Sequence, residues 1–165
     1  MVAEPRDGCG REGRRIVTHL RRLDHVAVLV RSTDDALEFY AGRLGLRVHS
    51  SEVIEQPHVR LTYLDAGNAF LQFVEPLDGD SPLATWLDEH GEGLHHLCFG
   101  VDEVATAVRD LSDAGAPVVL GNGRGRISSF LTAAASNGVR IECTEFVRGA
   151  DVDASPGFLP DGKEK

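Results

Sequence analysis

The chain contains an internal repeat, and this feature constrains its fold more than any other. The segment Asp24–Val30 (DHVAVLV) resembles His95–Val101 (HHLCFGV), 71 residues further along. Each copy is an apolar, strand-like run led by a polar residue and a histidine. Repeated units of this kind bury their apolar faces against each other. The repeat therefore predicts one domain built from two similar modules.

An amphipathic helix follows each copy of the repeated segment. In the first copy, Ser32 is a suitable N-cap, and apolar residues recur at helical spacing until Gly45. The same pattern runs from Val104 to Gly115 in the second copy. Three runs that alternate or are rich in β-branched residues come next in each module and predict strands. They are Leu46–Ile54, Val59–Ala66 and Phe70–Leu77, and then Ala116–Gly121, Arg126–Ala133 and Val139–Phe146.

These segments give each module the order βαβββ, so the fold class is α+β and the two modules can share one sheet that encloses a cavity. Between them, Ser81 and Pro82 are a typical helix start, and a linker helix runs to Gly91. The predicted domain is 23–146, with module 1 at 23–79, the linker helix at 80–93 and module 2 at 94–146. Residues 1–22 and 147–165 contain little that could be buried, and we expect flexible tails there, the N-terminal one basic.

The charge of the chain limits its partners. Seventeen basic and 26 acidic residues give a net charge of −9, which argues against nucleic acid as a partner. Residues 1–22 carry six arginines against three acidic residues, so the remaining chain is more acidic than the total. An anionic substrate must therefore meet a local group of arginines. The candidates are Arg60, Arg124, Arg126 and Arg140.

Cysteine usage and hydropathy indicate a compartment. The three cysteines form no CxxC motif, which argues against a disulfide framework and a thiolate zinc site. No apolar run approaches the roughly 18–20 residues that span a bilayer, and no hydrophobic signal core follows the N-terminal charges. We therefore expect a soluble, cytoplasmic protein without a membrane partner.

Four side chains at equivalent places in the two modules form a candidate metal site. His25 and Gln72 are 47 residues apart, and His96 and Glu142 are 46 apart. Two imidazoles, a carboxylate and an amide oxygen suit Zn, Fe, Co, Ni or Mn better than Mg or Ca. Four such ligands leave two octahedral positions open, which could chelate a substrate through two oxygens and stabilise an enolate.

Strand alternation assigns the neighbours of these residues to the other face. His95 precedes His96 directly, so at most one of the two is expected to enter the cavity, and the repeat selects His96. Glu75 lies an odd number of residues from Gln72 and should face away from the site.

The sequence resembles the vicinal oxygen chelate (glyoxalase, bleomycin resistance and dioxygenase) superfamily, and within it most closely the methylmalonyl-CoA epimerases. The matching stretches are LDHVAVLV, DDALEFYAGRLGL, LQFVEPLDGDSPLATWLDEHGEGLHHLCFGVDEV and NGVRIECTE, within residues 23–146. The long middle stretch is the most specific of them.

This resemblance implies an open, cup-shaped, eight-stranded mixed sheet around one divalent metal ion held by His25, Gln72, His96 and Glu142. It implies exchange of the α-proton of methylmalonyl-CoA through a metal-stabilised enolate, with Glu142 as the base. The partner would be a small acyl-CoA substrate, and a homodimer is expected because dimers are common in the superfamily.

The sequence departs from the epimerase pattern at two places. The position of a second glutamate in one type of epimerase is occupied by Arg60, while Glu52 and Glu55 lie nearby. The usual Phe-Leu-His-Pro-Lys becomes Phe130-Leu131 followed by Thr132-Ala133-Ala134. Arg60, Arg124 and Arg126 are the candidates for contacting substrate phosphates or a carboxylate.

Four other functions stay open at this point. A lactoylglutathione lyase would use the same fold, but that family usually has Glu at the position of Gln72. An extradiol dioxygenase would need only His25, His96 and Glu142 on Fe(II). A secondary-metabolism isomerase acting on another acidic carbonyl compound would keep the metal fold with a different substrate. A drug-binding resistance protein would hold its ligand in the same cup without metal.

Overall fold

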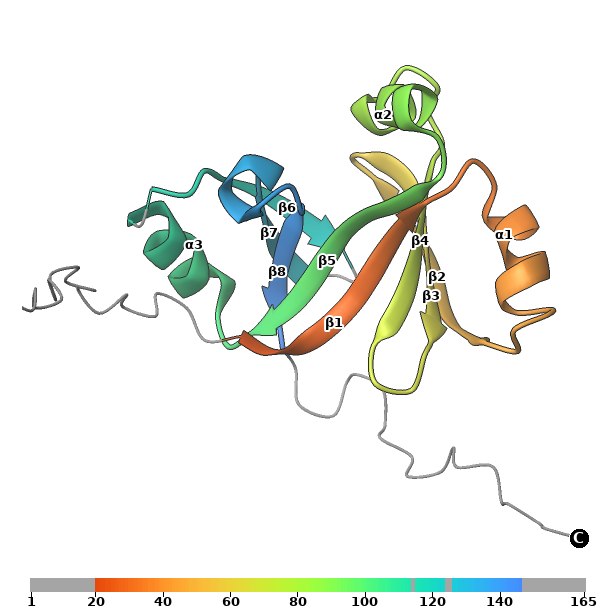
Figure 1. The fold of residues 1–165 in the computed structure, drawn as a ribbon, viewed down its shortest axis with the longest axis horizontal. Coiled ribbons are helices and arrows are strands. Elements are labelled where there is room, and N and C mark those ends of the chain that lie inside the picture. Colours follow the sequence, from red (N-terminus) through yellow and green to blue (C-terminus); the bar gives the residue numbers. More distant parts are fainter. Residues whose placement is uncertain (1–19, 114, 124–125, 147–165) are drawn as a thin grey trace, which may run out of the picture.

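A computed structural model describes residues 20–113, 115–123 and 126–146, and these residues form one mixed eight-stranded sheet. The strand order is β2-β3-β4-β1-β5-β8-β7-β6. The second half of this order repeats the first half in reverse, so the modules are related by a pseudo-two-fold axis between β1 and β5 (Figure 1). The predicted α+β fold of two βαβββ modules is confirmed.

Module 1 consists of β1 (Leu20–Leu29), α1 (Thr33–Tyr40), β2 (Arg47–Glu55), β3 (His58–Asp65) and β4 (Phe70–Pro76). The Ser32 side chain accepts a hydrogen bond from the Asp35 backbone N–H and so caps α1, as its position before the aspartates predicts. β1 begins at Leu20, inside the stretch 1–22 that the sequence suggests is a tail. The other residues of the two predicted tails lie outside the described chain.

Helix α2 (Pro82–His90) joins the modules and starts at the predicted Ser-Pro pair. Module 2 consists of β5 (Gly93–Val101), α3 (Val104–Asp113), β6 (Val118–Gly123), β7 (Arg126–Leu131) and β8 (Ile141–Glu145). A short 3-10 helix at Ala133–Ser136, which the sequence analysis misses, lies between β7 and β8. None of the described helices has the length and apolar character needed to cross a bilayer.

The outer helices each cover one module. α1 packs over a cluster that includes Val28, Leu64 and Phe73, while α3 packs over Val101, Leu131 and Cys143. Figure 1 shows α1 and α3 at opposite ends of the molecule and α2 above the sheet. The face of the sheet opposite to α1 and α3 is the concave one, and its apolar residues belong to a separate cluster around Ala27, Leu61 and Phe70.

The central pair β1 and β5 is antiparallel and irregular. Two of its irregularities leave Asp24 of β1 and His95 of β5 without a partner in the ladder. These residues occupy equivalent positions in the repeat, one before His25 and one before His96. An extra residue of this kind is a β-bulge, which changes where neighbouring side chains point.

Candidate metal centre

The four predicted ligands all lie on the concave face, where β4, β1, β5 and β8 run side by side. Ala27 of β1 pairs with Gln72 on one side and with His96 on the other. In the same way, Cys98 of β5 pairs with His25 and with Glu142. Residues directly opposite each other share a face of the sheet. The pairing therefore brings His25, Gln72, His96 and Glu142 to one point, and all four are buried.

Three of the four side chains are in direct contact. The Oε2 atom of Glu142 lies 3.1 Å from Nε2 of His25 and 3.0 Å from Nε2 of His96. The two Nε2 atoms are 3.3 Å apart. Three possible ligand atoms from three strands thus converge at the centre of the pseudo-symmetry.

Gln72 contributes an oxygen atom that lacks a partner. Its amide Nε2 donates a 2.7 Å hydrogen bond to the Tyr63 hydroxyl, and its Oε1 atom is buried without a hydrogen bond in the described structure. Buried polar atoms are nearly always paired, so an unpaired one indicates that a water molecule or an ion binds there. A cation bound beside His25 and Glu142 would satisfy this atom.

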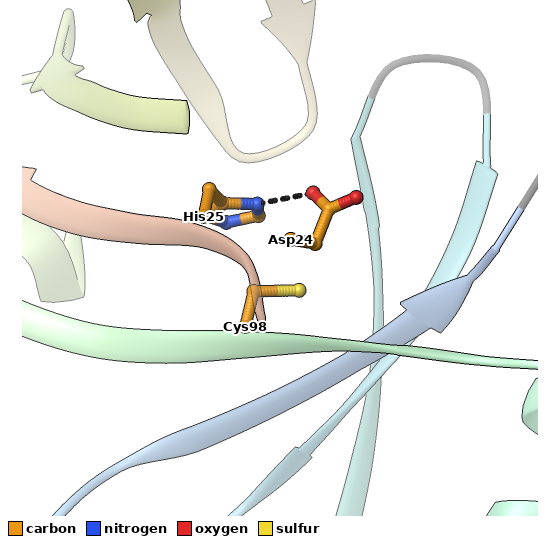
Figure 2. Close-up of side chains that lie close together, drawn as sticks. All are labelled: Asp24, His25 and Cys98. Atoms are coloured by element: carbon orange, nitrogen blue, oxygen red, sulfur yellow. Dashed lines mark hydrogen bonds and ion pairs between the residues drawn. The ribbon is translucent and has the colours of Figure 1, made fainter. Parts of the chain in front are cut away.

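Asp24 orients His25. The ring Nδ1 of His25 donates a 2.8 Å hydrogen bond to Oδ1 of Asp24, whose side chain is fully buried (Figure 2). Because a carboxylate only accepts, Nδ1 carries the proton and Nε2 faces Glu142. Cys98, which Figure 2 shows beside this pair, belongs to a second group of side chains, with Asp24 and His25, that could hold a metal ion. Burial raises the pKa of the Cys98 thiol, which therefore stays protonated.

The carboxylates of Asp24 and Glu142 favour a positive charge on the His25 ring that lies between them. Burial alone would lower the pKa of His25, but its hydrogen bonds to Asp24 and Glu142 raise it above the ordinary value. Burial opposes ionisation of Glu142, yet hydrogen bonds from His25 and His96 hold its pKa well below the ordinary value. Burial lowers the pKa of His96 despite its bond to Glu142. An ionised carboxylate between two imidazoles is also what binding of a divalent cation requires.

The expectation that His95 faces away from the cavity is wrong. In a regular ladder His95 would pair with Val28 and face α1, but the bulge puts Leu94 opposite Val28 instead. His95 consequently lines the cavity, and its Nδ1 lies 2.9 Å from Nδ1 of His96. Burial, with smaller effects from His96 and Arg140, lowers the pKa of His95 to about 3.

The centre opens into a cavity of about 430 Å³ between the two modules. Module 1 contributes an apolar wall that includes Val59, Leu61 and Val74, and α2 contributes Leu83. Module 2 contributes Phe130, whose ring meets that of His96 edge-on at 5.4 Å. The cavity suits a small ligand with an apolar part against these walls and a polar part beside His25, His96 and Glu142.

The structure does not bring Arg60 or Arg126 to this cavity. Arg60 lies on the face of α1, where it contacts Asp34 at 3.2 Å and Glu75 at 3.5 Å. Its neighbours Val59 and Leu61 line the cavity, so alternation alone could have assigned Arg60 to the other face. Arg126 donates to the backbone oxygen of Glu145. Arg124 lies outside the described residues, whereas Arg140 lines the cavity.

Glu75 faces away from the site, as predicted, and accepts a hydrogen bond from the Thr33 backbone N–H. Glu52, which the sequence analysis leaves without a role, lies on the concave side. It pairs directly with Leu61, and Ile54, two residues further along the same strand, lines the cavity. The register of the β2-β3 hairpin, which places Glu52 here, is not readable from the sequence alone.

Comparison with known proteins points to one superfamily. The chain is 32% identical over 130 residues to the uncharacterized protein YqjC of Bacillus subtilis, covering 76% of this chain and 93% of YqjC. It is 30% identical over 128 residues to the ethylmalonyl-CoA/methylmalonyl-CoA epimerase of Cereibacter sphaeroides, covering 73% of this chain and 95% of the relative. The chain spans about half the length of the mammalian mitochondrial methylmalonyl-CoA epimerases that it matches.

Solved structures agree with these relatives. Streptomyces coelicolor methylmalonyl-CoA epimerase, in complex with 2-nitronate-propionyl-CoA, superimposes with a TM-score of 0.73 at 31% identity, covering 79% of this chain and 100% of that one. Residues 24–132 match the family model described as the glyoxalase/bleomycin resistance protein/dioxygenase superfamily. This match covers the repeat, the linker helix and three of the four converging side chains. The chain therefore belongs to the glyoxalase/bleomycin resistance protein/dioxygenase superfamily.

Proposed function

We propose that this protein is a metal-dependent epimerase that exchanges the α-proton of a 2-substituted malonyl-CoA such as methylmalonyl-CoA. The observation that carries the proposal is the convergence of His25, His96 and Glu142 beside the unpaired oxygen of Gln72, at the base of a cavity. Relatives with similar sequences and structures are named as epimerases of this substrate class. The expected homodimer and the cytoplasmic location stay predictions.

The donor set fits a divalent cation. His25, Gln72, His96 and Glu142 would hold it, with Asp24 fixing the ring of His25 and Tyr63 fixing the amide of Gln72. When bound, the cation would supply Lewis-acid stabilisation of negative charge on the substrate oxygens. The mixed nitrogen and oxygen donors are compatible with Co, Zn, Ni, Mn or Fe.

Glu142 is positioned to accept the α-proton of the substrate. Its carboxylate is ionised, because hydrogen bonds from His25 and His96 keep its pKa low, and it lines the cavity.

Epimerisation also requires a proton on the opposite face of the α-carbon, and Glu52 is the candidate for this role. It is on β2 of module 1, whereas Glu142 is on β8 of module 2, so the two carboxylates approach from different modules. Glu142 is the one carboxylate among the described residues that line the cavity directly, and Glu52 lies on the same concave face beside Ile54.

Proton exchange tests this division of roles. Each single epimer of methylmalonyl-CoA is incubated in deuterated water, and NMR and chiral analysis follow the α-position. The wild-type protein should incorporate deuterium and interconvert the epimers. Glu142→Gln and Glu52→Gln should each abolish interconversion of the epimers. Each variant should still exchange, slowly and without inversion, the α-proton of the one epimer whose α-proton faces the carboxylate that remains.

Metal content provides an independent measurement. Purified wild-type protein should contain about one divalent ion per chain, and His96→Ala should lose it, whereas His58→Ala, outside the cavity, should retain it. An unchanged metal content in His96→Ala would refute the site. Metal-loaded protein that leaves the α-proton of both epimers in place would refute the epimerase function.

A further inference from the structure

Arg140 is the only arginine or lysine among the described residues that line the cavity. It directly precedes β8, two residues before Glu142, and residues at this spacing share a face of a strand. Two strand residues span about 7 Å. A permanent positive charge therefore lines the same cavity as Glu142, the carboxylate that we propose as the base.

Among the described residues, Arg140 has no acidic partner. Several other described arginines pair with carboxylates, for example Arg60 with Asp34 and Arg31 with Asp88, but no carboxylate of the described chain lies within ion-pair distance of Arg140. Within the described chain, its guanidinium donates a 3.2 Å hydrogen bond to Nε2 of His95. One of five guanidinium N–H donors is used in this way, so most of its donors are available to a ligand.

His95 holds Arg140 in place without neutralising it. Because a guanidinium only donates, Nε2 of His95 must accept, and His95 is an uncharged imidazole. The ring of His95 is fixed from two sides, by the edge-on contact with Trp86 at 5.3 Å and by the contact with His96. The bulge that turns His95 toward the cavity thus creates a neutral support for an arginine.

The walls of the cavity make this charge important for binding. Val119 and Phe130 of module 2 line the cavity together with Arg140 and cannot solvate an anion, whereas Asn122, Thr132 and Thr144 offer uncharged polar groups and Arg140 itself is exposed. A carboxylate that loses part of its hydration in this cavity is best compensated by a charged hydrogen-bond donor. Arginine is the residue best suited to this role, because its planar fork can bind a carboxylate through two parallel hydrogen bonds.

We propose that Arg140 is a specificity-determining residue that recognises the free carboxylate of the substrate, so that the site selects 2-carboxyacyl thioesters over acyl thioesters lacking that group. The proposal rests on the proposed function and names its substrate class from a residue outside the metal centre. Because Arg140 and Glu142 line the same cavity two residues apart, one substrate could place its carboxylate against the guanidinium and its α-carbon near Glu142.

The test compares methylmalonyl-CoA with propionyl-CoA, which lacks only the carboxylate. Both are titrated calorimetrically into chelator-treated protein, so that a carboxylate cannot gain affinity by binding metal. Wild-type protein should prefer methylmalonyl-CoA, and Arg140→Gln should reduce this preference about tenfold while leaving the affinity for propionyl-CoA unchanged. The preference of Arg140→Lys should lie between those of the wild type and Arg140→Gln, because lysine keeps the positive charge but lacks the planar, two-pronged guanidinium. Arg43→Gln, at an exposed position outside the cavity, is the matched control.

An Arg140→Gln protein with the same preference as wild type and Arg43→Gln would overturn the proposal, as would a wild-type protein without any preference. Equal unfolding midpoints for the three variants exclude a folding defect as the cause. The outcome is separate from the proposed function: loss of preference in Arg140→Gln supports carboxylate recognition even where no α-proton exchange occurs. Conversely, if the wild-type protein exchanges the α-proton normally but Arg140→Gln keeps the wild-type preference for methylmalonyl-CoA, the epimerase function is supported and the role of Arg140 is refuted.

Discussion

Replacing Tyr63 by phenylalanine should weaken both the fold and metal binding, because this hydroxyl holds the side chain of Gln72 in place. Tyr63 is 1% exposed, and its hydroxyl accepts the 2.7 Å hydrogen bond from Nε2 of Gln72. An amide can rotate by half a turn and exchange its oxygen and nitrogen. With the hydroxyl present, Nε2 is bonded to Tyr63 and the unpaired Oε1 is the atom left for a cation.

The expected size of the effect follows from the burial of both groups. In Tyr63→Phe, Nε2 of Gln72 becomes a buried donor without its acceptor, which costs about 1–3 kcal/mol of unfolding free energy. Loss of a group that orients a metal ligand typically lowers metal affinity by about 10- to 100-fold. Urea unfolding of the metal-free protein measures the first quantity, and calorimetric titration with Zn²⁺ or Co²⁺ measures the second.

The chain supplies its own control, because Tyr40 is its one other tyrosine. The Tyr40 ring packs against Phe73 beneath α1, on the opposite face of the sheet. Tyr40→Phe should change stability by less than about 0.5 kcal/mol and leave metal affinity unchanged. If Tyr63→Phe behaves like Tyr40→Phe in both assays, the hydroxyl does not orient the amide. A symmetric carboxylate has no amide to orient, so in a Gln72→Glu background Tyr63→Phe should cost less metal affinity.

Two other predictions concern the buried groups around the centre. Asp24→Asn should lower the pKa of His25 in the metal-free protein, because burial is then opposed by Glu142 alone, and should weaken metal binding about 10- to 100-fold; histidine NMR titration and calorimetry measure these changes. Cys98 and Cys143 should resist alkylation in the native protein at pH 8 and react after unfolding, since burial raises the pKa of both thiols, that of Cys143 to about 11. Peptide mapping distinguishes the two sites, and rapid native labelling of either one would contradict its burial.

The repeat accounts for what could be predicted from the sequence. Alignment of the two copies identified β1 and β5, the helices after them and the four side chains that the structure brings together. Alternation correctly turned Glu75 away from the site. It failed for His95, because a bulge adds one residue to a strand and leaves no distinctive sequence pattern. The position of Glu52 depends on the pairing register of a hairpin, which is set in three dimensions.

The paired bulges bear on how the two halves of this domain could diverge. If an ancestral module was duplicated, its irregular strand was inherited twice, and deletion of the extra residue in either copy would rotate part of that strand to the opposite face. The length of each strand is therefore under stronger constraint than the residue at the bulge. Substitution there is tolerated by the backbone, and one descendant position holds Asp24 while the other holds His95. Two structurally equivalent histidines have thereby acquired different neighbours, an anionic one in the first half and a neutral one in the second.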